Sequence, residues 1–159
     1  MEKQHEQHKQ DKMMYKKFAL MIVLSFIAMY VLMYSMVDKF SNALPNINQF
    51  YMAGLMTMPM VILEIVIMGG MYMNKKLNKG ILAIGFILMV VFFLGIRKQA
   101  AVGDRQFLRS MIPHHAAAIL MVEKASLNNP EIKKLAENII TSQTAEIELM
   151  KRILKEMKK

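Results

Sequence analysis

The chain has 159 residues, of which 19 are methionine and none is cysteine or tryptophan, and its formal net charge at pH 7 is +9. Without cysteine, disulfides and thiolate metal sites are excluded, so any soft-metal chemistry must use methionine sulfur and histidine nitrogen. The positive charge flanks apolar runs and lacks the interleaved aromatic residues of a nucleic-acid surface, so we expect no nucleic-acid partner.

Three long apolar runs indicate a membrane part that precedes a soluble part. Residues 1–17 form a polar tail, and residues 18–37 carry no charge over a length sufficient to cross a hydrocarbon layer of about 30 Å. Residues 50–73 form a second predicted span, and residues 81–96 form a shorter third one. We therefore expect residues 18–96 to form a three-helix membrane domain.

Lysine and arginine residues near the spans predict their orientation. The tail and the connection between the second and third spans hold eight of them, against five on the other side. Because the more positive side stays in the cytoplasm, we expect a cytoplasmic N-terminus and an extracytoplasmic C-terminal domain in a multi-pass membrane protein.

Glu64 and rows of methionine stand out within the predicted spans. Met52, Met56, Met60, Glu64 and Met68 follow one another at i, i+4 spacing, which would suit a path for a soft ion. Methionine is also an ordinary apolar residue in lipid, and a protonated Glu64 could hydrogen-bond to a neighbour. We favour this second interpretation, in which the partner of Glu64 is one of three hydroxyl-bearing residues: Ser25, Tyr30 or Tyr34.

Residues 97–159 are amphipathic, and we predict a helical hairpin there. The first helix runs from about 104 to 125, and the second starts after Asn129 as N-cap with Pro130 at the first helical position. Pro113 lies inside the first helix, where it removes one backbone hydrogen bond, so we expect a kink or bulge just before the histidines.

The motif Met111-Ile112-Pro113-His114-His115 places two imidazoles and a thioether within five residues. At about 100° per residue, polar and sulfur-bearing side chains of each helix share one face. A turn near residue 128 would bring the two faces together. The predicted metal ligands are Asp104, Met111, His114 and His115 with Met121 on the first helix, and Gln143, Glu146 and Met150 on the second.

Simpler roles exist for several of these residues. Met121 and Met150 could be core residues, and Asp104 could be an N-cap. The adjacent histidines favour a site more strongly, because two imidazoles beside an apolar stripe cost desolvation energy unless they bind a ligand or are hydrogen-bonded. Methionine with histidine and no cysteine favours Cu(I) or Ag(I), whereas two histidines with Glu146 would also accept Zn²⁺.

The motif and its downstream partners resemble a known family over residues 104 to about 154. The matching residues are Phe107, Met111 to His115, Ala118-Ile119, Leu135-Ala136, Ile139-Ile140, Gln143, Glu146-Ile147 and Met150. They resemble the bacterial family known as domain of unknown function 305. The resemblance implies a ferritin-like helical domain in mostly exported proteins, several of them linked to copper and silver binding or resistance.

The family pattern has two hairpin repeats in a four-helix bundle, whereas this chain has one clear repeat. We therefore expect a half-bundle that a second copy completes; alternatively, the second and third spans act as a degenerate first repeat. Together these features predict an all-α protein of the bacterial cell membrane that binds Cu(I) or Ag(I) in metal homeostasis or resistance. The alternatives are an accessory subunit of a metal pump and a metal-dependent enzyme, and no catalytic residue is assigned.

Overall fold

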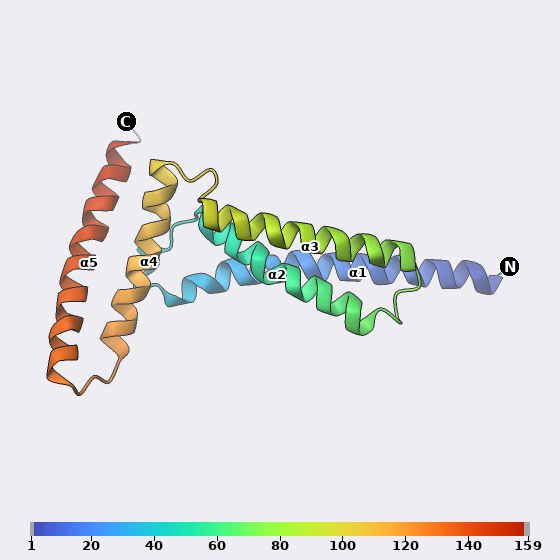
Figure 1. The fold of residues 1–159 in the computed structure, drawn as a ribbon, viewed down its shortest axis with the longest axis horizontal. Coiled ribbons are helices and arrows are strands. Elements are labelled where there is room, and N and C mark those ends of the chain that lie inside the picture. Colours follow the sequence, from blue (N-terminus) through green and yellow to red (C-terminus); the bar gives the residue numbers. More distant parts are fainter. Residues whose placement is uncertain (1, 158–159) are drawn as a thin grey trace. The chain divides into compact units, whose positions relative to one another are not determined.

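The computed structural model describes residues 2–157, with side chains described from residue 10 onward. The regular secondary structure of these residues is entirely helical, without a strand, which confirms the predicted all-α class (Figure 1). The elements are α1 (Glu2–Leu32), the short 3₁₀ helices η1 (Met33–Met36) and η2 (Phe40–Asn42), α2 (Ile47–Met68), α3 (Lys75–Lys98), α4 (Asp104–Lys124) and α5 (Pro130–Glu156).

Three helical segments are long and apolar enough to cross a membrane, as predicted. They are Gln10–Met36, Ile47–Met68 and Lys75–Lys98. The first and third begin earlier than predicted, because lysine-bearing residues continue the helix on its polar end. The second ends earlier, at Met68. A Cβ at the following Gly69 would collide with the carbonyl oxygen of Ile65, so glycine allows the chain to leave the helix there.

The chain forms two compact units. One contains the residues up to Val31 together with Phe50–Ala100, and the other contains Leu32–Gln49 together with the residues from Ala101 onward. The connection between α1 and α2 therefore belongs to the same unit as the last two helices. The sequence-based division into residues 18–96 and 97–159 places this connection in the membrane domain instead.

The first unit packs α1, α2 and α3 around a small apolar core. Its buried members are Phe18, Met58, Val61, Ile65 and Tyr72. Aromatic rings pack against one another where the core meets the α2–α3 connection: the ring centroids of Phe18 and Tyr72 are 5.5 Å apart, and their planes are tilted by 57°. The burial of this cluster holds the three apolar helices together.

A polar network closes this core at the α2–α3 connection. The Tyr15 hydroxyl donates to Asn78 Oδ1 at 2.7 Å, and Asn78 Nδ2 donates to the Tyr72 carbonyl at 2.9 Å. The Tyr72 hydroxyl in turn donates to Glu64 Oε1 at 3.0 Å. Tyr72 was not among the partners predicted for Glu64; it reaches the carboxylate because the chain turns back directly after Met68.

The second unit has its core between α4 and α5, which lie side by side (Figure 1). The buried residues recur at helical spacing on each helix, so each contributes one apolar stripe. They are Leu108, Ile112, Ala116, Ile119, Ile147 and Met150, with Val37, Leu44, Met111 and Leu154 packed against them. Val37 and Leu44 come from the α1–α2 connection, which covers part of α4.

Individual residues mark the start of α5 and the course of α4. The Asn129 side chain accepts hydrogen bonds from the backbone N–H groups of Glu131 and Ile132, which confirms the predicted N-cap of α5. α4 is helical on both sides of Pro113. The histidine motif therefore lies in the middle of one long helix.

Candidate metal-binding face

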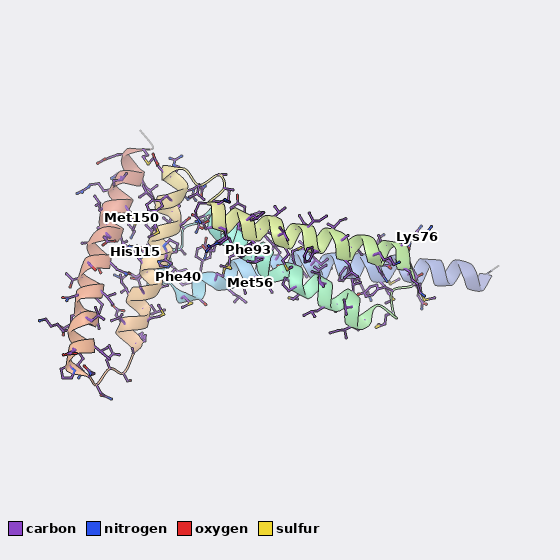
Figure 2. All side chains as sticks on the ribbon, in the orientation of Figure 1. Phe40, Met56, Lys76, Phe93, His115 and Met150 are labelled. Atoms are coloured by element: carbon purple, nitrogen blue, oxygen red, sulfur yellow. The ribbon has the colours of Figure 1, made fainter. Side chains whose placement is uncertain are left out.

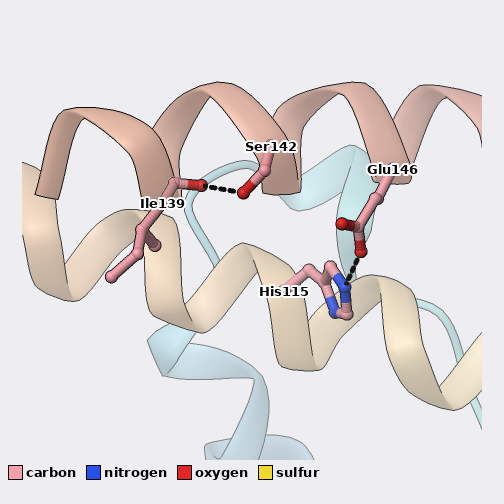
Figure 3. Close-up of polar contacts among 4 residues, drawn as sticks. All are labelled: His115, Ile139, Ser142 and Glu146. Carbon is pink, nitrogen blue, oxygen red and sulfur yellow. Dashed lines mark hydrogen bonds and ion pairs between the residues drawn. The ribbon is translucent and has the colours of Figure 1, made fainter. Parts of the chain in front are cut away.

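His115 and Glu146 meet across the α4–α5 interface (Figure 3). His115 Nε2 lies 2.7 Å from Glu146 Oε2. The histidine is buried, with its side chain 10% exposed, whereas the Glu146 side chain is 56% exposed. The contact thus links two residues that are 31 positions apart in sequence. The Glu146 carboxylate reaches the imidazole from a largely exposed position on α5.

This contact sets the role of each ring nitrogen of His115. A carboxylate accepts hydrogen bonds, so Nε2 carries the proton and donates it to Glu146. In the neutral ring, Nδ1 then keeps its lone pair. Nδ1 is buried and has no hydrogen-bond partner among the described residues. A buried imidazole that is held by a carboxylate through one nitrogen, with the other nitrogen free, is the usual arrangement of a metal-ligating histidine.

Sulfur and amide groups accompany His115 along the same interface. Met111 precedes His115 by four residues and packs against the core, and Met150 is itself a buried core residue (Figure 2). Gln143 Oε1 is a second buried acceptor without a hydrogen-bond partner among the described residues. The α4–α5 interface therefore holds an imidazole lone pair, an amide oxygen and two thioethers.

His114 differs from its neighbour. Its side chain is exposed, and its ring centroid lies 6.1 Å from that of His115 with the ring planes tilted by 60°. Consecutive residues on a helix point about 100° apart, which explains why one imidazole enters the interface and the other remains in solvent.

Asp104 and Met121 lie farther along α4 from His115. Asp104 is exposed in the first turn of α4, and a rise of 1.5 Å per residue separates it from His115 by about 16 Å along the axis. Met121 is exposed and about 9 Å beyond His115 by the same measure. Neither distance suits a ligand that shares one ion with His115.

The described residues contain no group of three or more histidine, aspartate, glutamate or cysteine side chains able to hold a metal ion. A hard or borderline ion such as Zn²⁺ would need such a group. The candidate donors on this face are mixed instead, with sulfur beside nitrogen and oxygen.

Sequence reasoning did not predict the contacts that hold this part of α4 against the end of the α1–α2 connection and the first turn of α2. Asn48 Nδ2 donates to Ser110 Oγ at 3.2 Å, and the Ser110 hydroxyl lies 3.3 Å from Asn46 Oδ1. The backbone N–H of Ile47 donates to Gln106 Oε1 at 3.2 Å. The only available signal was the asparagine-rich composition of the connection, which does not specify a partner.

The chain is thus an all-helical protein with three potential membrane spans and a two-helix unit that carries a buried histidine. Residues 95–154 match the family model described as "Domain of unknown function (DUF305)". The chain belongs to this family. It is 38% identical over 146 residues to the "Uncharacterized protein L153" of Acanthamoeba polyphaga mimivirus, a match that covers 87% of this chain and 91% of that protein. No solved structure gives a significant match.

The similarity to the mimivirus protein extends beyond the matched domain. Residues 95–154 account for less than half of this chain, whereas the aligned region covers most of it. The relative comes from a virus and not from a bacterium, so the bacterial origin implied by the resemblance is not supported by this comparison.

Proposed function

We propose that this protein binds a soft metal ion, Cu(I) or Ag(I), between α4 and α5, and that it serves copper or silver homeostasis or resistance. The observation that carries the proposal is the buried His115, whose Nε2 lies 2.7 Å from Glu146 Oε2 while its Nδ1 has no hydrogen-bond partner among the residues that the structure describes. An imidazole held in this way is ready to bind a metal without reorganisation.

The neighbouring thioethers favour a soft ion. Met111 and Met150 lie in or against the same interface, and thioether sulfur selects Cu(I) among the common biological metals. His114 is exposed one position before His115 and supplies a solvent-accessible imidazole for the incoming ion. Zn²⁺ remains the less favoured alternative, because Glu146 is already engaged with His115.

The proposed setting is a membrane surface. Three helices are long and apolar enough to cross a membrane, and the excess of lysine near the N-terminal side favours a cytoplasmic N-terminus. With an odd number of spans, α4 and α5 then lie outside the cytoplasm as a ferritin-like half-bundle. There the protein would collect or buffer the ion. Its proposed protein partner is a metal pump, to which it would transfer the ion.

The test is a metal titration of the full-length protein in detergent. Cu(I) affinity is measured by competition with a chromophoric chelator under reducing conditions, and Ag(I) is titrated in parallel because it has no redox chemistry of its own here. Replacing both histidines, His114→Ala with His115→Ala, should abolish tight binding, whereas Met157→Ala, an exposed methionine near the end of α5, should change nothing. Unchanged Ag(I) affinity in the double variant would exclude this site.

A further inference from the structure

A pocket of about 350 Å³ in the second unit is lined by four cationic side chains and two leucines. Its lining residues are Leu44, Arg105, Arg109, Lys151, Leu154 and Lys155. Arg105 and Arg109 are one turn apart on α4, and Lys151 and Lys155 are one turn apart on α5. Each helix thus presents two cations to the same cavity, and none of them belongs to the His115 face.

These positive charges are poorly compensated by the protein itself. The one ion pair that the described residues show for them joins Lys151 Nζ to Glu148 Oε1 at 3.8 Å, on a Glu148 side chain that is 72% exposed. Asp104 and Glu156 are sequence neighbours of the cluster, but both are exposed and neither is ion-paired within the described structure. Four like charges around one cavity repel one another unless an anion enters.

The cavity differs from an ordinary solvated basic face in its shape and its floor. Leu44 and Leu154 pack against the buried core and form its apolar part. Charges beside an apolar wall are screened less than charges in open solvent, so they attract an anion more strongly. The volume lies at the lower end of the range for small-molecule sites, which suits a compact anionic group with a short organic part.

We propose that this pocket binds a phosphate-bearing anion. The planar guanidinium groups of Arg105 and Arg109 offer paired N–H donors that match phosphate oxygens, and Lys151 and Lys155 add point charges from the opposite helix. The leucine floor contacts the carbon-bearing part of the ligand.

The phosphate group has two possible sources, a soluble phosphate compound and the headgroup of an anionic lipid. Chain connectivity makes a headgroup accessible. Leu44 lies in the connection between α1 and α2, and Arg105 follows the end of α3 at Lys98 by seven residues, a stretch that spans at most about 25 Å. Residues so close to the ends of apolar helices are within reach of a headgroup layer.

The experiment uses the full-length protein and has two arms. In the first, inorganic phosphate and glycerol phosphate are titrated by calorimetry into protein in a maltoside detergent. In the second, the protein is taken from phosphatidylcholine nanodiscs with or without phosphatidylglycerol, and native mass spectrometry counts the phosphatidylglycerol molecules that stay bound. Binding in the first arm alone assigns a soluble anion, and retention in the second alone assigns a headgroup. Either result supports the pocket.

A charge-matched pair of variants tests whether the pocket is responsible. Arg109→Gln with Lys155→Gln removes two cations from the pocket, and Arg152→Gln with Lys133→Gln removes two from exposed positions of α5 outside it. The pocket variant should weaken binding by at least about tenfold, as expected for the loss of two charge-assisted hydrogen bonds. The control should stay within about twofold of the unaltered protein.

Two outcomes overturn the proposal: no binding of any probe by the unaltered protein, or equal weakening in both double variants, which would indicate a diffuse effect of net charge. The far-UV circular dichroism signal of the helices checks that each variant is folded. If the double pocket variant loses its helicity, the exposed single change Lys155→Gln is compared with Lys133→Gln in the same two arms, with an affinity loss expected for the first change only.

Discussion

Glu146 Oε2 and His115 Nε2 lie 2.7 Å apart, and this contact joins a largely exposed carboxylate on α5 to a buried imidazole on α4. The carboxylate therefore orients the ring and determines which nitrogen carries the proton. Glu146 was predicted as a direct metal ligand. Its position beside Nε2 instead gives it a positioning role in the proposed site, because Nδ1 is the nitrogen that remains available.

Replacing Glu146 should distinguish these two roles. Glu146→Ala removes the acceptor for Nε2–H and should lower Cu(I) affinity by about 10- to 100-fold, the usual cost of losing such a partner. Glu146→Gln keeps an oxygen acceptor and should retain most of the affinity. Competition titration of both variants provides the measurement. Equal losses in Glu146→Gln and Glu146→Ala would mean that the carboxylate itself binds the ion.

Ile112 should be the most sensitive core position of the second unit. It lies on α4 and is fully buried in the core that α4 forms with α5. Ile112→Ala should therefore destabilise this unit by about 2–5 kcal/mol, because apolar burial is lost and a cavity is left behind. Ile132, which is 48% exposed, is the control, and Ile132→Ala should cost far less. Thermal unfolding followed by circular dichroism compares them; similar midpoints for the two variants would contradict the described core.

The phenol of Tyr72 should ionise at a higher pH than that of an ordinary tyrosine. Burial raises the pKa of Tyr72 above 10.0, and the hydrogen bond and charge of Glu64 raise it further. Because the folded-state pKa lies above the unfolded value, the resulting stabilisation is present below about pH 10 and is lost as the pH rises through the folded-state pKa. A difference titration of phenolate absorbance between the protein and Tyr72→Phe isolates this group. Onset in the ordinary tyrosine range would contradict both the burial of the Tyr72 phenol and its contact with Glu64.

The topology can be tested with introduced cysteines, because the chain has none of its own. Ser126→Cys lies in the exposed α4–α5 connection, and Gln10→Cys lies in the exposed part of α1 that precedes the apolar run. In intact cells, an impermeant thiol reagent should label position 126 directly and position 10 only after permeabilisation. The reverse pattern would place α4 and α5 in the cytoplasm and would require a different source of metal.

Self-association should cover an apolar stripe that α5 leaves exposed. Leu135 is 58% exposed and Leu149 is 44% exposed, and their separation of 14 residues places them within about 40° on the helix. Two copies related by a two-fold axis would bury this stripe and complete a four-helix bundle. We expect light scattering of the detergent-solubilised protein to show a dimer.

Leu135→Gln with Leu149→Gln should shift this dimer to a monomer. Thr141→Gln with Thr144→Gln changes two exposed polar positions of the same helix and should leave the dimer intact. A protein that is monomeric without any substitution, yet binds metal and unfolds cooperatively, would exclude the dimer and favour a bundle completed within one chain.

Much of the fold follows from local patterns in the sequence. Uninterrupted apolar runs predict three potential membrane spans, because a helix in lipid needs about 20 apolar residues. Asn129 followed by Pro130 predicts the start of α5, because capping depends only on neighbouring backbone groups. The spacing of His115, Gln143 and Glu146 on helical faces predicts a shared interface, and the structure places all three in or beside it.

The sequence by itself therefore determined the helices, the apolar faces and the histidine that lies on one of them. The tertiary structure alone decided that Glu146 pairs with Nε2 of His115, that Asp104 lies about three turns away from this pair, and that four cations surround one pocket. It also decided that the α1–α2 connection packs on α4. These features depend on the rotation and axial register of one helix against another, which the packing of the whole core sets and which no local pattern encodes.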